Sequence, residues 1–369
     1  MLELPLKKLD DSFFRYDIDS LKEYFSSLES FLDGEEYLNT LKFARKVMFS
    51  HEIKANNQIE GYGDDINVIK SAITNAQTIK DVSQRNRIIN LYNAYNYILN
   101  NLQIDKKSLK ELYSIISRDL LGSKDLENMG EYYRAQPVYI LKNGRLDMDF
   151  DEGLPHSRVE EFMDCYFNYL HSLNFENATD NYVQSQILHF YFVYIHPYFD
   201  VNGRTSRTVA MWYLLNNNNY PYIIFNRGIS FQGSSYDKSI FQAKRSGDIT
   251  SFLKMMLETV QIELEKEYVM DFISKNISDK MTAQDYQTLL YFLSMNGLKT
   301  VLDFASVYNS KNERKRALEI YRDMIVPLLD KGILDIERET GKRIGNFNNK
   351  VLTLRPFDYD KDKVQKLHF

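Results

Sequence analysis

The stretch HPYFDVNGRTSR, residues 196–207, gathers residue types that ordinary packing rarely needs together. A helix is expected to begin near its middle, because TSRTVAMWYLL continues with apolar residues at helical spacing. Arg204 and Arg207 then lie in the first helical turn, where the helix dipole is already positive. Two cations there are unfavourable unless an anion binds between them, so the spacing predicts a phosphate site.

The remaining polar residues of this stretch supply the rest of a group-transfer chemistry. His196, close to neutral at working pH, can accept a proton from an attacking hydroxyl. Asp200 offers a hard oxygen ligand of the kind that Mg²⁺ uses beside substrate phosphates. Asn202 offers an amide donor to a phosphate oxygen, and Gly203 keeps the loop tight. The pattern predicts transfer from a nucleotide polyphosphate–metal complex onto a hydroxyl, driven mainly by positioning and charge stabilisation.

The composition limits the class of protein that carries this stretch. The 369 residues suggest two or three folded units, and 44% hydrophobic with 26% charged residues is typical of a globular protein. A net charge of -5 argues against a generic nucleic-acid coat, and a single cysteine excludes an intramolecular disulfide. The longest apolar run, residues 187–195, is too short to span a bilayer, and we expect a cytoplasmic protein without membrane contact.

The elements that must position the stretch are expected to be mainly α-helical. Residues 1–105 are predicted as a helical N-terminal region, with a helix over about 41–61. Residues 106–270 are predicted as the catalytic core, in which a β-hairpin around Asn143–Gly144 interrupts the helices. In residues 275–369, three helices precede two short strands, which is the order of a winged-helix domain.

The motif resembles the signature of the Fic family, His-Pro-Phe-x-Asp/Glu-Gly-Asn-Gly/Lys-Arg-x-x-Arg. The positions that match it are His196, Pro197, Asp200, Asn202, Gly203, Arg204 and Arg207. Tyr198 replaces the Phe and Val201 replaces the Gly, although a β-branched residue resists a positive φ. The resemblance covers roughly residues 50–265. It implies a Fic-type helical core with a small β-hairpin flap, an N-terminal helical region and a C-terminal winged helix.

By this resemblance the chain would be a protein adenylyltransferase that moves AMP from ATP, with Mg²⁺, onto a Ser, Thr or Tyr hydroxyl of a target protein. His196 would be catalytic and Asp200 would hold the metal. The ATP site would comprise Asn202, Gly203, Arg204, Arg207 and Tyr236. Tyr236 would pack on the adenine, with an equally weighted alternative that it belongs to the core. The flap residues that bind the target by strand addition would be Pro137, Val138, Tyr139 and Ile140, with Arg134 at the usual flap arginine.

The segment NNQIEG, residues 56–61, resembles the family's inhibitory motif, Ser/Thr-x-x-x-Glu-Gly/Asn. By resemblance, Glu60 would pair with Arg207 and take part of the γ-phosphate site, because a carboxylate can stand in for a phosphate oxygen. Asn56 replaces the Ser or Thr, and we expect this change to affect the cap of the turn rather than the blocking group.

Three other functions remain open. The same fold could transfer another phosphate-containing group, although relatives that do so usually carry Lys at the position of Gly203. It could also remove AMP, with Glu60 positioning water. The third is a DNA-binding regulator with a vestigial Fic core. The basic residues of the tail that favour it are Arg314, Lys315, Arg316, Arg322, Arg338, Lys342 and Arg343. Protein docking or pairing with a second copy is at least as well supported for the tail as DNA binding.

Overall fold

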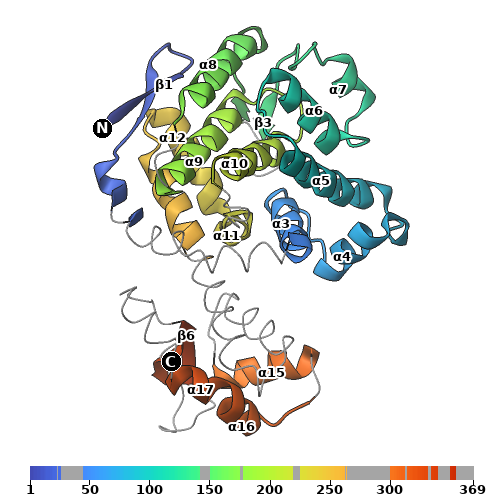
Figure 1. The fold of residues 1–369 in the computed structure, drawn as a ribbon, viewed down its shortest axis with the longest axis vertical. Coiled ribbons are helices and arrows are strands. Elements are labelled where there is room, and N and C mark those ends of the chain that lie inside the picture. Colours follow the sequence, from blue (N-terminus) through green and yellow to red (C-terminus); the bar gives the residue numbers. More distant parts are fainter. Residues whose placement is uncertain are drawn as a thin grey trace. The chain divides into compact units, whose positions relative to one another are not determined.

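The chain divides into two compact units, Met1–Glu263 and Leu264–Phe369 (Figure 1). The computed structural model describes residues 1–22, 24–25, 45–141, 150–174, 178–218, 225–261, 263, 300–311, 314–330, 334–339 and 350–354. The described residues are mainly α-helical, which confirms the predicted fold class. The predicted division at 105–106 does not separate compact units, because both sides of it belong to the first unit.

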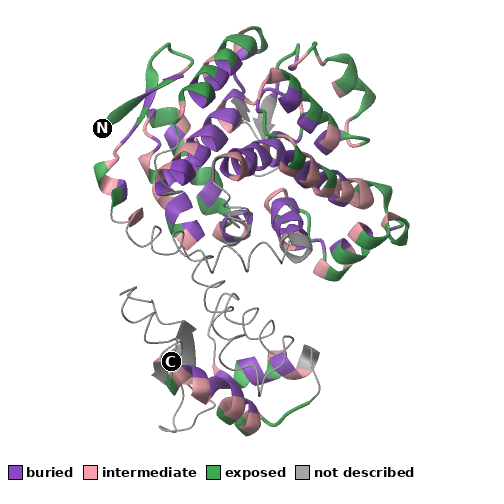
Figure 2. Ribbon diagram, viewed as in Figure 1, coloured by how far each residue is buried: buried purple, intermediate pink, exposed green. Residues whose placement is uncertain are grey.

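In the described part of the first unit, the helices lie around a central pair, α9 and α10 (Figure 1). Their bounds are α3 Arg45–Ile59, α4 Ile66–Thr74, α5 Val82–Asn100, α6 Lys106–Ser117, α7 Ser123–Glu127, α8 Val159–Ser172, α9 Ala178–Ile195, α10 Asn202–Asn218, α11 Phe225–Gln232 and α12 Ser234–Ser246. Short 3₁₀ turns lie at Asp19–Leu21, Ala76–Thr78 and His156–Arg158, and a further helix covers 250–261. Helices α9 and α10 pack against each other, and buried residues concentrate on them in Figure 2.

Helix α9 is central because its sequence is apolar on nearly every face. Ile187, Leu188, Phe190 and Phe192 are all buried, although they point in different directions around the helix axis. The polar residues among them, including His189, are fully buried as well. The apolar run that is too short for a membrane span is therefore the core of the first unit. Among the described residues, no helix combines the length and apolarity that crossing a bilayer requires.

The N-terminus forms a β-hairpin that the sequence analysis missed. Strands β1, Leu2–Lys7, and β2, Phe13–Tyr16, pair antiparallel, and Leu4, Leu6, Phe14 and Tyr16 bury their side chains. The alternation is short and Pro5 interrupts it, so it is hidden beside the helical pattern that follows.

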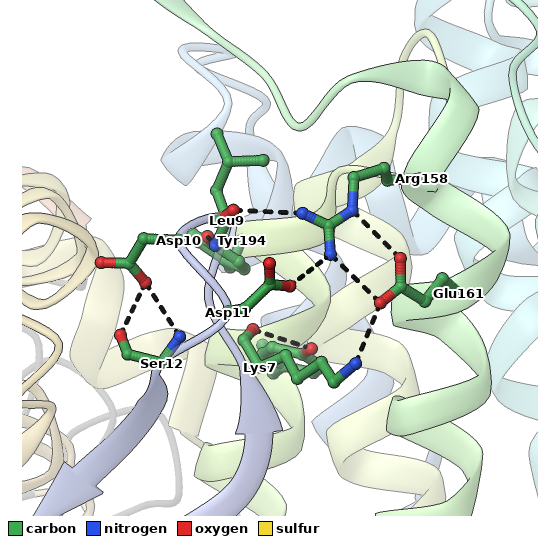
Figure 3. A network of polar contacts seen from close by, with 9 residues as sticks. Lys7, Leu9, Asp10, Asp11, Ser12, Arg158, Glu161 and Tyr194 are labelled. Carbon is green, nitrogen blue, oxygen red and sulfur yellow. Dashed lines mark hydrogen bonds and ion pairs between the residues drawn. The ribbon is translucent and has the colours of Figure 1, made fainter.

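Polar contacts join the turn of this hairpin to α8 and α9 (Figure 3). Arg158 donates to the carbonyl of Leu9 at 3.1 Å and to Asp11 Oδ1 at 2.7 Å, and it pairs with Glu161 at 3.0 Å. The hydroxyl oxygen of Tyr194, two residues before His196, accepts from the Leu9 amide of the same turn at 2.7 Å. The hairpin therefore anchors the carboxyl end of α9.

A second hairpin corresponds to the predicted flap. Strands β3, Tyr139–Leu141, and β4, Phe150–Glu152, pair antiparallel with Tyr139 opposite Glu152 and Leu141 opposite Phe150. The predicted turn at Asn143–Gly144 lies outside the described residues.

The second unit is described in part. It contains α15 Val301–Lys311, α16 Ala317–Ile320, a π-helical turn Tyr321–Ile325, α17 Val326–Asp330, and the strands β5 Leu334–Glu339 and β6 Lys350–Leu354. The strands pair antiparallel after the helices, in the predicted order. The first helix predicted for the tail lies outside the described residues, and the winged helix stays a prediction.

Candidate active site

The loop between α9 and α10 is held in an unusual backbone conformation. Its first residue, His196, has φ 52° and its last, Val201, has φ 55°, both in the left-handed region that favours glycine. Val201 is buried, and its carbonyl accepts from the Thr205 amide at 2.9 Å. The valine therefore does adopt the conformation that its β-branched side chain resists, at a cost on the order of 1–2 kcal/mol.

Asn202 fixes this loop from within. Its Oδ1 accepts from the amide of Tyr198 at 3.0 Å, and its Nδ2 donates to the carbonyl of Tyr198 at 2.8 Å. Both ends of the side chain are thus engaged with the main chain. The Asn202 amide was predicted to bind a phosphate oxygen, whereas in the structure its Nδ2 binds and positions the loop.

Arg204 and Asp200 lie near the start of α10, where Arg204 is buried and Asp200 is exposed. Arg204 is 4% exposed and its Nε is buried without a hydrogen-bond partner among the described residues. Its Nη2 lies 3.9 Å from Asp200 Oδ1, and the Asp200 side chain is 59% exposed. A buried guanidinium with an unpaired donor is costly unless a further acceptor binds, which fits an anion at the start of the helix.

Asp200 offers one carboxylate, which fits a magnesium ion that also binds the phosphates of a nucleotide. Asp200 uses Oδ1 to accept from the Val201 amide at 2.6 Å, and its exposed carboxylate faces solvent. The described residues contain no group of three or more His, Cys, Asp or Glu side chains that could hold a metal by themselves. One carboxylate with phosphate oxygens and waters is a common Mg²⁺ environment.

The side chain of Arg207 forms hydrogen bonds to Asn56 and Glu60 at the end of α3. Its Nη2 donates to Glu60 Oε1 at 2.5 Å, and Asn56 Oδ1 accepts from Nε at 3.0 Å and from Nη2 at 2.8 Å. Burial by itself lowers the pKa of Arg207, but the charge of Glu60 and the interactions with Tyr236 and the Glu60 hydrogen bond together outweigh burial, so the pKa is raised. Asn56 is buried and contacts Arg207 directly, so the expectation that it affects only the cap of the turn is wrong.

Gly203 leaves the space that Glu60 occupies. A Cβ at this position would lie 2.5 Å from Glu60 Oε1 and 3.1 Å from Arg207 Nη1. Any larger residue would displace the carboxylate. The glycine is therefore required by the contact between α3 and α10 in this state.

His196 is held as a neutral imidazole. Burial, as the largest cause, and the positive charges of Lys244 and Arg134 together lower its pKa to about 3. The ring therefore has a free lone pair at neutral pH, as a general base needs.

Tyr236 is placed in the core. It is 4% exposed, and its hydroxyl lies 2.8 Å from Nε2 of the buried His189, whose ring stacks with it. This burial matches the alternative of a core position, and packing on adenine stays a prediction. His189 was not identified from the sequence, because a histidine inside an apolar run has no distinguishing spacing.

The flap residues lie at the start of β3. Pro137 is exposed and Val138 is buried, while Tyr139 and Ile140 belong to the strand itself. Arg134 is 2% exposed, and its Nε donates to the carbonyl of His196 at 2.8 Å.

Two further residues support the contact to Arg207 and carried no signal in the sequence. The hydroxyl of Tyr95 on α5 accepts from Asn56 Nδ2 at 3.1 Å. Asp64 accepts from Asn57 Nδ2 at 2.8 Å and from Gln84 Nε2 at 2.8 Å, which fixes the turn after Glu60. Tyr95 is 39 positions from Asn56, whereas Asp64 is 7 positions from Asn57.

Comparisons with known proteins agree with this arrangement. The model of the Fic/DOC family matches residues 103–214. A protein named "Protein adenylyltransferase Fic" from Drosophila grimshawi is 27% identical over 233 residues, covering 61% of this chain and 44% of the relative. The protein of the same name from Culex quinquefasciatus is 27% identical over 255 residues, covering 67% and 46%. The chain thus spans less than half the length of these curated relatives.

Solved structures show the same fold. A Fic family protein from Desulfovibrio desulfuricans has a TM-score of 0.59 at 16% identity, with 92% of this chain and 97% of that chain covered. A variant of Fic-1 from C. elegans has a TM-score of 0.51 at 15% identity, with 70% and 73% covered. Residues 103–214 therefore match the Fic/DOC family model, and the chain is similar to the named relatives and shares the fold of these structures.

Proposed function

We propose that this chain transfers AMP from ATP onto a Ser, Thr or Tyr hydroxyl of a target protein. The observation that carries the proposal is the loop that joins a neutral His196 to the amino end of α10, where Arg204 keeps a buried donor unpaired. The relatives that are named protein adenylyltransferases support the same reaction.

In this reaction the target hydroxyl attacks the α-phosphorus of ATP while His196 takes up its proton. The new bond joins the hydroxyl oxygen to phosphorus, and the bond from phosphorus to the β-bridging oxygen breaks, so pyrophosphate leaves. Arg204, Arg207 and the first amides of α10 would bind the phosphates and stabilise the charge that develops on them. Asp200 would hold Mg²⁺, which neutralises phosphate charge when it is bound.

The contact between Glu60 and Arg207 would make this site autoinhibited. Arg207 is 1% exposed, and Glu60 together with Asn56 occupies its Nε and Nη2. A phosphate would have to displace the carboxylate to bind the same guanidinium. As long as Glu60 stays on Arg207, nucleotide would bind in a pose that does not favour transfer. Movement of the end of α3 would release this restraint.

The proposal is tested with ATP labelled on either the α- or the γ-phosphate, using the Glu60→Gly variant and a cell lysate as the source of targets. Label from α-phosphate on protein, with none from γ-phosphate, is expected. Label from γ-phosphate would indicate phosphoryl transfer instead. Absence of both labels, together with a salt-dependent shift of random duplex DNA, would favour the regulator with a vestigial core.

A further inference from the structure

Arg134 is a buried cation whose side chain binds carbonyl oxygens. It is 2% exposed, and no carboxylate pairs with it among the described residues. Burial lowers its pKa to about 10, and no neighbouring acid raises it again. Burying an arginine without an anionic partner is expensive, so its hydrogen bonds must do something that a smaller or apolar residue could not.

On one side, Arg134 holds the main chain at the general base. Its Nε donates to the carbonyl of His196 at 2.8 Å, and its own amide donates to the carbonyl of Pro197 at 2.9 Å. Two consecutive carbonyls are thus fixed directly after α9. His196 has the left-handed φ of 52°, a conformation that needs support from its surroundings.

On the other side, the same guanidinium closes the base of the flap. Nη1 donates to the carbonyl of Gln136 at 3.0 Å and Nη2 donates to the carbonyl of Leu154. These residues precede β3 and follow β4, and the amide of Gly153 donates to the carbonyl of Val138 at 3.1 Å between them. One side chain therefore joins both ends of the hairpin to the histidine loop.

We propose that Arg134 is a positioning residue that sets the register between a target segment bound along the flap and the imidazole of His196. This inference rests on the proposed function for its kinetic consequence, because it assumes that the flap binds the target. Breaking the link should impair transfer to a bound target much more than nucleotide binding, since Arg134 makes no contact with the start of α10 among the described residues.

The test compares Arg134→Met and Arg134→Lys in the Glu60→Gly background, with Arg85→Met as a control. Arg85 is also partly buried, but it lies on α5, away from the flap and the 196–207 loop in the sequence. We expect Arg134→Met to lower kcat for a target about 100-fold with KM for ATP within threefold, and Arg134→Lys to recover part of the loss. The acid limb of the pH profile should also move to higher pH, because the Arg134 charge helps to lower the pKa of His196.

A second measurement does not depend on activity. Hydrogen–deuterium exchange at 138–141, 150–154 and 196–198 should accelerate together in Arg134→Met and stay unchanged in the control. If Glu60→Gly shows no transfer, the proposed function fails and the exchange result alone decides the positioning role. Equal kcat and equal exchange in a folded Arg134→Met would overturn the inference. Should that variant not fold, a folded Arg134→Lys with unchanged kcat and exchange would do so.

Discussion

Asn56 offers the most selective way to perturb the contact that would restrain the proposed AMP transfer. Its Oδ1 accepts two hydrogen bonds from Arg207, and it lies four residues before Glu60 at the same end of α3. Both contacts are therefore lost together when this end of the helix moves away. Asn56→Ala removes the two hydrogen bonds from Arg207 to Asn56 and leaves the pair of Glu60 with Arg207 in place. It should therefore weaken the closed state, in which the end of α3 lies on Arg207, without abolishing it.

The size of the effect follows from the bonds that are lost. A hydrogen bond to a charged group contributes about 1.5–3 kcal/mol, and water that enters the space left by the amide recovers part of it. We take about 2 kcal/mol for the pair of bonds, which corresponds to roughly a 30-fold larger population of the open state. The basal transfer rate should rise by a similar factor and stay below that of Glu60→Gly.

The assay is the rate of AMP incorporation from ATP and Mg²⁺, followed by intact-mass spectrometry. Gln58→Ala is the matched control, because Gln58 lies on the same helix and is exposed. A rate for Asn56→Ala equal to that of wild type, or below it, would refute the reasoning. Such a result would mean that the asparagine orients Arg207 for catalysis and does not restrain it.

Three further predictions follow from the same site. Gly203→Ala should lower the free energy of unfolding by about 1–2 kcal/mol, because its Cβ would lie 2.5 Å from Glu60 Oε1. The loss should be much smaller when Glu60 is already replaced by Gly. Urea unfolding of wild type, the two single variants and the double variant tests this, and equal losses in both backgrounds would contradict it. Transfer by Glu60→Gly should stay constant from about pH 7 to pH 5, because burial first and nearby positive charge second lower the pKa of His196 to about 3; a fall with a midpoint near 6.5 in a pH–rate profile would show an ordinary imidazole. Burial also lowers the pKa of His189 to about 3 from 6.5. The contribution of this group to the free energy of unfolding should be complete above pH 6.5 and should fall by roughly 1.4 kcal/mol per pH unit as pH falls towards 3. The slope of the unfolding free energy against pH, from urea unfolding, should be smaller in His189→Gln, and an unchanged slope would assign the dependence to other residues.

The sequence predicted the helical fold, the flap hairpin and the stretch at 196–207, because each has a local pattern. It could not predict the partners of that stretch. Asn56 and Arg207 are 151 positions apart, and their contact depends on how α3 packs against the core. The main-chain role of Asn202 was missed for a related reason, since an amide in a loop can bond either a ligand or the loop itself.

The N-terminal hairpin shows a different limit. Leu4 and Leu6 alternate over too few residues to compete with the helical pattern that follows, and their burial depends on α8, which is more than 150 residues away. For the left-handed conformation of Val201 the sequence held one signal, the glycine that the similar motif carries there; the intrinsic preference of valine argues against it, and the surrounding loop overrides that preference.

The proposed function requires that Glu60 block a site in which His196 activates a hydroxyl for attack on ATP. The decisive experiment is intact-mass spectrometry of wild type, Glu60→Gly and Glu60→Gly with His196→Ala, each incubated with ATP and Mg²⁺. We expect added AMP groups on Glu60→Gly, few on wild type and none on the double variant. Equal modification of wild type and Glu60→Gly, or modification that survives the loss of His196, would contradict it.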